Sequence, residues 1–164
     1  GYGPNGVAMM IDIVTDNRNR SVAAVRHTLT RVGGSMASPG AVAWQFDRKG
    51  LINVESDIDF FELFEAAAEA GAEDVVEGED GDPHEVYTSP NALNQVSGSL
   101  KEAGLEIKDP ALVMMPQNEV SLDTRDSVRI LKLISEIEDL DDVRQVYSNL
   151  EMTAEAVEAY ATEA

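Results

Sequence analysis

Apolar and polar positions alternate along the first fifty residues in the order expected for a strand, a helix and a second strand. Residues 7–14 form a nearly continuous apolar run of strand-forming side chains, which is typical of a strand covered on both faces. After the polar turn at 15–20, apolar side chains recur at the spacing of one helical stripe, at Val22, Val25, Leu29 and Val32. Ser21 is the expected N-cap of this helix, and Gly33-Gly34 its end.

The segment 42–47 alternates at the two-residue period of a strand. Val42, Trp44 and Phe46 are apolar and point to one side of this predicted strand, while Ala43, Gln45 and Asp47 occupy the other side. We therefore expect Trp44 to lie in the core.

The middle of the chain contains a second set of elements. The pattern predicts a strand at 51–55, a helix at 57–71, a short strand at 73–77, a strand at 84–89, a helix from about Asn91 and a last strand within 105–115. The order β-α-β-β-α-β is that of the ferredoxin-like split unit. Residues 51–118 are therefore expected to form a complete small domain.

The elements after residue 118 lack a partner of their own. A helix is predicted from Thr124 or Asp126 to Asp139, followed by a strand at 143–150, and neither is stable alone. We therefore expect an α+β protein in which residues 1–50 and 119–150 form one discontinuous domain and the ferredoxin-like domain 51–118 is inserted in it. The acidic tail 151–164 favours a helix that frays.

The charge of the chain is strongly negative and unevenly distributed. Twelve Lys and Arg stand against 31 Asp and Glu, for a formal net charge of −19. Residues 1–50 carry +3, residues 51–100 carry −13 with no Lys or Arg, and residues 101–164 carry −9. A uniformly acidic surface repels phosphate, so nucleic-acid contact is expected in the first segment and excluded for 51–118.

Composition excludes several classes of protein. A length of 164 residues with 43% apolar residues allows a substantial core in one or two small domains. The absence of cysteine excludes disulfides, thiol nucleophiles and cysteine metal sites. No run approaches the roughly 18 apolar residues of a membrane span, and the N-terminus lacks the regions of a signal peptide. We expect a cytoplasmic protein with no membrane partner.

No residue pattern indicates catalysis or a cofactor. GYGPNG matches G-x-G-x-x-G, but a strand follows it and none precedes it, so it is interpreted as a tight turn. The two histidines, His27 and His84, belong to different predicted domains, and no triad or metal spacing surrounds them. The acidic cluster around Glu77 lacks the ligand register of a calcium loop. We therefore predict a non-enzymatic protein with no metal, cofactor or small-molecule substrate.

The first predicted helix carries the strongest candidate for nucleic-acid contact. Arg20, His27 and Arg31 share the face opposite its apolar stripe, Arg26 lies on the flank and Arg18 in the preceding turn. Arginines exposed in this way contact phosphate in DNA or RNA, although a solvated basic face has the same pattern. The nucleic-acid-binding candidates are Arg18, Arg20, Arg26, His27 and Arg31.

Four motifs together carry a family resemblance. G-Y-G-P-x-G at the start, T-D-N-R-N-R at 15–20, G-A-E-D-V at 71–75 and D-D-V-x-x-V-Y at 141–147 combine over almost all of residues 1–150. The chain resembles the YebC/PmpR family of bacterial regulatory proteins, whose mitochondrial relatives activate translation of cytochrome c oxidase subunits. The resemblance implies a basic N-terminal helical domain, a second α+β domain, and a ferredoxin-like third domain inserted in the second. GYGPNG matches a point about a third of the way into such proteins, so the helical domain is expected to be missing from these residues.

The resemblance implies a regulator of gene expression, with two possible targets. One is promoter DNA, bound as a transcriptional regulator; the other is the ribosome, through ribosomal RNA, during stalled synthesis of proline-rich sequences. In both cases the missing domain is expected to make most of the contacts. A third hypothesis, from the charge alone, is a protein-binding module in which Glu77, Glu79 and Asp80 dock a basic protein partner.

Overall fold

The computed structural model describes residues 1–163 except 39, 56 and 80; Asp80 of the acidic cluster thus lies outside the described residues. The chain divides into two compact units. Unit 1 comprises Gly1–Asp47 and Met115–Ala164, and unit 2 comprises Arg48–Met114. The chain passes from unit 1 to unit 2 within one strand, β2 (Phe46–Val54), and returns within another, β5 (Ile107–Pro116).

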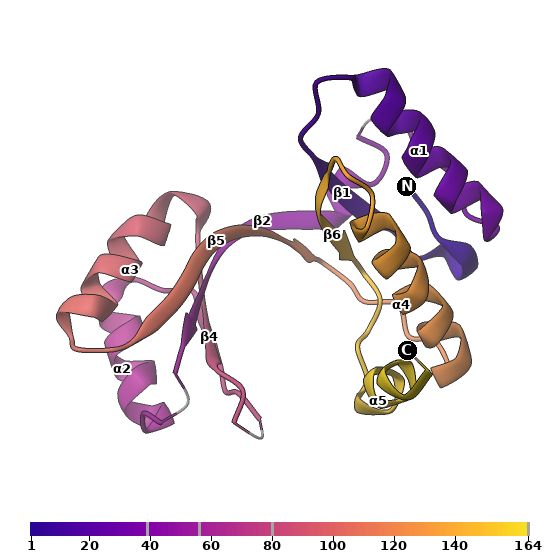
Figure 1. Ribbon diagram of the computed structural model, residues 1–164. Helices are drawn as coiled ribbons and strands as arrows, with labels where there is room; N and C mark the ends of the chain where they lie inside the picture. The colour runs from indigo at the N-terminus through magenta and orange to yellow at the C-terminus, as the bar shows by residue number, and fades with distance from the viewer. Residues whose placement is uncertain (39, 56, 80, 164) are drawn as a thin grey trace. The chain divides into compact units, whose positions relative to one another are not determined.

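Unit 1 is built on a two-stranded antiparallel sheet. β1 (Met9–Ile13) pairs with β6 (Val143–Ser148) in a register that places Met9 opposite Ser148. The helices α1 (Arg18–Arg31) and α4 (Thr124–Glu138) pack together beside this sheet (Figure 1). The apolar faces of these helices pack against the sheet in one core. It is formed by Val7, Met9, Val25, Leu29, Ile130, Leu133, Ile137, Val146 and Leu150. The late helix and strand thus complete the early ones, as the sequence pattern predicted.

Helix α1 begins four residues earlier than predicted. Asn17, rather than Ser21, is its N-cap, because the Asn17 side-chain oxygen accepts the Arg20 N–H at 3.1 Å. Ser21 lies inside the helix and is buried. The predicted end is confirmed: the helix stops at Arg31 and Gly33 follows with φ of +89°, a conformation that glycine adopts without strain.

The strand predicted at 42–47 is wrong before Phe46. Residues Ala43–Gln45 form a 3₁₀ turn, and Trp44 is 68% exposed rather than buried. Val42 and Phe46, the residues that flank this turn, are both buried. Phe46 is the first residue of β2. This strand continues through Gly50 to Val54, so it includes all but the last residue of the strand predicted separately at 51–55.

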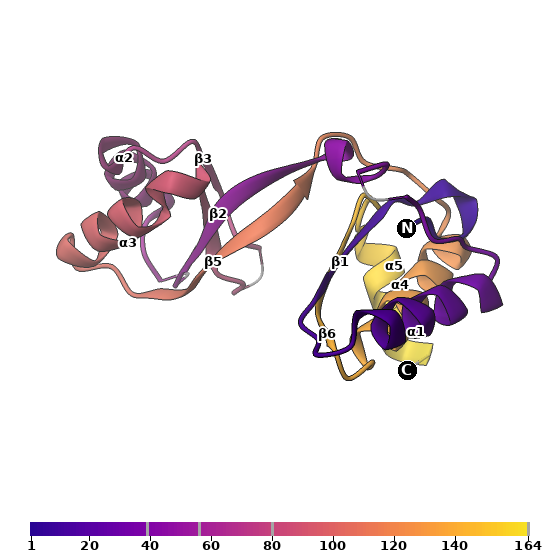
Figure 2. The same cartoon turned by 90° about the horizontal axis from the view of Figure 1, so that it is seen from above.

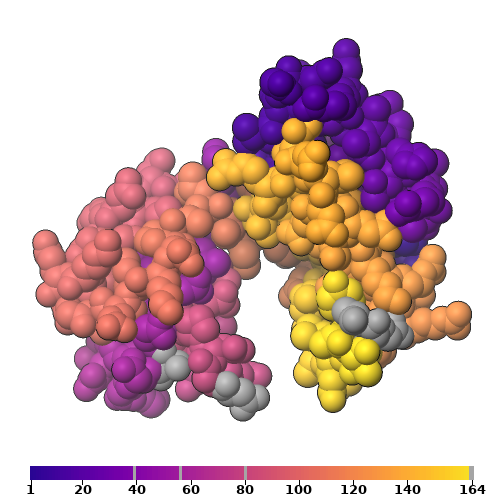
Figure 3. Space-filling view, in the orientation of Figure 1, coloured from indigo at the N-terminus to yellow at the C-terminus, as the bar shows by residue number. Residues whose placement is uncertain are grey.

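The C-terminal segment is anchored. Residues Ala154–Glu163 form helix α5, which packs on α4, and the Thr153 hydroxyl accepts the Ala156 N–H at 3.1 Å. Ala156 is fully buried, and the space-filling view shows this segment, in yellow, against the orange segment of α4 (Figure 3). The helix expected in this tail is confirmed, and its cap and its packing on α4 both stabilise it.

Unit 2 has the predicted ferredoxin-like order. Its elements are β2, α2 (Phe60–Ala70), β3 (Asp74–Val76), β4 (His84–Thr88), the short 3₁₀ turn Pro90–Ala92, α3 (Leu93–Glu102) and β5. The sheet order is β3-β4-β2-β5, with β4 antiparallel to both β2 and β3. Helices α2 and α3 lie on one face of this sheet (Figure 1 and Figure 2). Their contact with the sheet buries a separate core: Ile52, Val54, Leu63, Ala67, Ala70, Val86, Leu93, Val96 and Leu100. The fold is therefore α+β, as predicted.

Candidate nucleic-acid interface

The predicted basic residues all lie on the outside of α1. Its buried positions are Ser21, Val25, Thr28 and Leu29. The candidates Arg18, Arg20, Arg26, His27 and Arg31 are all exposed. Arg18 is the first residue of the helix rather than part of the preceding turn.

Arg20 is held by carboxylates of its own chain. Its Nη2 lies 3.0 Å from Asp16 Oδ1 and 3.1 Å from Asp142 Oδ2. Asp142 belongs to the turn between α4 and β6, so this ion pair joins α1 to that turn. The two carboxylates raise the pKa of Arg20, chiefly through the hydrogen bond to Asp142.

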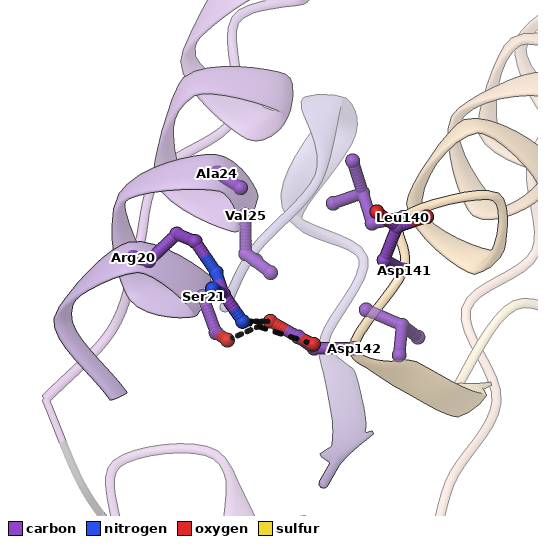
Figure 4. Close-up of a pocket in the computed structure, with 8 residues that line it drawn as sticks. Arg20, Ser21, Ala24, Val25, Leu140, Asp141 and Asp142 are labelled. Carbon is purple, nitrogen blue, oxygen red and sulfur yellow. Dashed lines mark hydrogen bonds and ion pairs between the residues drawn. The ribbon is translucent and has the colours of Figure 1, made fainter. Parts of the chain in front are cut away.

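Asp142 is the acceptor at the centre of this junction. The Ser21 hydroxyl donates to Asp142 Oδ2 at 2.5 Å, and the Thr15 hydroxyl donates to the same oxygen at 3.1 Å. In Figure 4, Arg20 and Ser21 of α1 point toward Asp142, and all three residues line a small cavity of about 160 Å³. The hydrogen bond from Ser21, followed by that from Arg20, holds the pKa of Asp142 below its usual value. Arg20 therefore has a structural role at this junction.

Arg31, at the other end of α1, is also paired. Its guanidinium forms an ion pair with Glu136 of α4, which lies beside α1. Two of the five candidate residues thus have carboxylate partners that reduce their net attraction for phosphate. Arg18, Arg26 and His27 make no ion pair with any carboxylate in the part of the chain that the structure describes.

A second basic face, which the sequence analysis missed, lies on α4. Arg125, Arg129 and Lys132 occur at i, i+4 and i+7, so they share one helical face. They line a hollow of about 530 Å³ together with Val128 and, from α5, Ala159. The Arg129 guanidinium is 3.7 Å from Asp126, a loose contact. The spacing of these three residues is present in the sequence, but the net charge of −9 over residues 101–164 gives no indication of a basic face.

The acidic candidates lie apart from these cations in the chain, in unit 2. Glu77 and Glu79 are exposed in the loop that follows β3. Among the described residues, no three His, Asp or Glu side chains are placed to hold a metal ion. None of the helices in the described part is both long and apolar enough to cross a membrane.

Comparison with known proteins assigns the chain to a family. The model of the second and third domain of TACO1/YebC matches residues 1–150. The chain belongs to the TACO1/YebC family. A "probable transcriptional regulatory protein" of Trichlorobacter lovleyi is 44% identical over 158 residues, covering 96% of this chain and 63% of its own length. One of Bifidobacterium animalis is 50% identical over 150 residues, covering 91% and 59%.

A solved structure matches the fold as well. The crystal structure of a conserved hypothetical protein from Aquifex aeolicus superposes with a TM-score of 0.85 at 40% identity. The match covers 93% of this chain and 63% of that protein. This chain therefore spans somewhat less than two thirds of the length of these relatives.

The motifs that carry the resemblance to YebC proteins have structural roles here. T-D-N-R-N-R and D-D-V meet at Asp142, as described above. In the segment after β6, the buried Asn149 accepts the Ala8 N–H at 2.9 Å and donates its own N–H to the Ala8 carbonyl, which ties this segment to the N-terminal strand region. In G-A-E-D-V, Gly71 ends α2 with φ of +97°.

Proposed function

We propose that this chain belongs to a non-enzymatic regulator of gene expression and that the unpaired cations of α1 and α4 contact the phosphate backbone of DNA. The observation that carries the proposal is the exposure of these cations on two neighbouring helices of an otherwise acidic protein. Arg18 and Arg26 on α1, and Arg125 on α4, have no carboxylate partner among the described residues. The names of the relatives, probable transcriptional regulatory proteins, support the same class of function.

Electrostatics restrict the contact to this part of unit 1. A net charge of −19 opposes the approach of DNA, but charges separated by more than about 8 Å are largely screened at physiological ionic strength. A local group of arginines therefore still attracts phosphate, while the acidic residues 51–100 keep unit 2 away from the duplex. Contacts of this kind position the protein without reading a sequence.

The test is a matched pair of double charge reversals in the full-length protein. Arg18→Glu with Arg26→Glu removes two proposed contacts, and Arg48→Glu with Lys101→Glu makes the same change in net charge in unit 2, at exposed positions. We expect the first variant to weaken binding to duplex DNA and to lower the steepness of the salt dependence by about 0.9 for each phosphate that is no longer neutralised. The second variant should bind nearly as the wild type does.

Equal affinity of both variants and the wild type for DNA would overturn the proposed contact. Ribosomal RNA offers the same phosphate chemistry, so the assay is repeated with ribosomal particles. A loss of particle binding with unchanged DNA binding in the first variant would replace DNA by the ribosome as the target. Crosslinking in cells, followed by sequencing of the attached nucleic acid, distinguishes the two independently.

A further inference from the structure

Helix α2 of unit 2 exposes a cluster of aromatic rings. Phe61 is 76% exposed and Phe64 51% exposed, although both are large apolar side chains. The ring of Phe60 contacts both, with its centroid 6.4 Å from each of the other two. Contiguous exposed rings of this kind are typical of a surface that another molecule covers.

A hollow of about 540 Å³ lies beside these rings. Phe60 and Phe61 line it together with Asp59, Glu77, Gly78 and His84. The loop that leads to His84 is tightly closed at Gly78, where a Cβ would come within 2.2 Å of the Asp82 carbonyl oxygen. Glycine is therefore required there for the loop to bring its backbone to His84.

His84 lines this hollow and has a buried hydrogen-bond donor that is not satisfied. The side chain is buried, and its Nδ1 accepts the Gly78 N–H at 2.9 Å. Since Nδ1 is an acceptor, the proton of the neutral ring is on Nε2. Nε2 is buried and has no partner among the described residues. A buried donor without an acceptor is unfavourable, so an acceptor supplied by a bound molecule would stabilise the complex.

The charge around the hollow determines what kind of molecule fits. Asp59 and Glu77 line it, and Glu62 and Glu65 are exposed on the same helix as the rings. No Lys or Arg occurs between residues 50 and 100. Phosphate is repelled here, and so is the equally acidic unit 2 of a second copy. Basic side chains are attracted by the carboxylates and also by the faces of aromatic rings.

We infer that the α2 aromatic cluster and the hollow at His84 form a docking site for a basic segment of a protein partner. In this arrangement Lys or Arg side chains of the partner lie over Phe61 and Phe64 and pair with Asp59 and Glu77. An apolar side chain enters the hollow against Phe60, and a backbone carbonyl accepts the proton of His84 Nε2. The site belongs to unit 2 and the proposed DNA-contacting cations belong to unit 1, so this inference does not depend on the proposed contact with DNA.

The first test uses three synthetic dodecapeptides and the full chain. The probe is (Lys-Phe-Lys-Leu)₃; the controls are the acidic (Glu-Phe-Glu-Leu)₃ and a peptide of twelve lysines, which lacks apolar side chains. We expect saturable binding of the first, none of the second and weaker binding of the third. Phe61→Ser with Phe64→Ser should reduce affinity for the first peptide about tenfold or more, because both rings are contact residues.

The matched control replaces an exposed aromatic residue elsewhere. Trp44→Ser removes a ring that is 68% exposed in unit 1, and it should leave peptide affinity unchanged. All substituted side chains are exposed, so each variant is expected to keep the fold. Equal peptide affinity of the wild type and the Phe61/Phe64 variant, or equal binding of the acidic peptide, would overturn the docking site.

The second test observes His84 directly without replacing it. In ¹⁵N-labelled protein, saturation with the basic peptide should shift the Nε2 resonance of His84 and slow exchange of its proton, because that proton gains an acceptor. An unchanged resonance at saturation would show that His84 Nε2 does not contact the peptide. The same shift on addition of a DNA or RNA oligonucleotide would identify a nucleic acid as the occupant and overturn the inference. The variant with Phe61→Ser and Phe64→Ser should still bind nucleic acid as the wild type does. Failure of the docking site is therefore distinguishable from failure of the proposed function.

Discussion

At the scale of residues, Asp142 shows how one side chain can join distant parts of a chain. It accepts hydrogen bonds from Thr15 and Ser21 and pairs with Arg20, all more than a hundred residues away. Because these partners favour its ionised form, they lower the pKa of the carboxyl in the folded state. An acid whose pKa falls on folding stabilises the fold while it is ionised.

Replacement of this residue should have an effect that depends on pH. Asp142→Asn is expected to unfold at a lower urea concentration than the wild type at pH 7, where the carboxylate contributes fully. The contribution is present above the unfolded pKa and is lost as the pH falls through the folded value, which lies below 3.8. Urea titrations at pH 7 and near pH 3 measure the difference. A gap between the two proteins that is as large at the acid pH as at pH 7 would contradict an electrostatic role.

At the scale of elements, short patterns of polar and apolar residues proved ambiguous where tertiary contacts decided the outcome. Val42, Trp44 and Phe46 fit a strand, but only Phe46 belongs to one, since a 3₁₀ turn at 43–45 leaves Trp44 exposed. Ser21 fits an N-cap, but Asn17 takes that role and Ser21 turns inward to Asp142. Three or four positions carry too little periodicity to separate such alternatives.

Helix α5 provides a prediction at this scale. Ala156 is fully buried and Ala154 is exposed, so the same substitution has different consequences at the two positions. Ala156→Leu should destabilise unit 1 by about 1–3 kcal/mol through overpacking, while Ala154→Leu should have little effect, since Leu and Ala both favour helices. Urea unfolding and hydrogen exchange of the α5 amides measure both. Equal stability of the two variants would mean that α5 is not packed as described.

At the scale of the whole molecule, the chain contains two cores that share no residue. One is formed around Leu133 in unit 1 and the other around Leu63 in unit 2, and both side chains are almost completely buried. Leucine-to-alanine substitution in a core costs about 2–5 kcal/mol because it leaves a cavity. We expect each substitution to lower the free energy of unfolding only of the unit that contains the substituted leucine.

Paired core substitutions test this expectation. Leu63→Ala should lower hydrogen-exchange protection of amides in residues 48–114 and leave the most protected amides of unit 1 unchanged. Leu133→Ala should do the reverse. Loss of protection throughout the chain in both variants would show that the units unfold as one cooperative structure instead.

The sequence by itself determined the order of the elements, the fold class and the family. Long periodic segments such as 124–139 and the β-α-β-β-α-β order of the insert are local properties, because each element requires only its own spacing of apolar residues and its own caps. The exposed position of the basic candidates of α1, from Arg18 to Arg31, follows from the same helical periodicity.

Only the tertiary structure decided which charged and apolar side chains are free to bind. Arg20 and Arg31 share the predicted outer face of their helix with His27, yet Asp142 and Glu136 neutralise these two arginines from more than a hundred positions away. The exposed rings of Phe61 and Phe64, and the unsatisfied nitrogen of His84, likewise follow from how α2 and the loop before β4 pack. Ion pairing, burial and unsatisfied hydrogen bonds are relations between distant residues, and local spacing does not contain them.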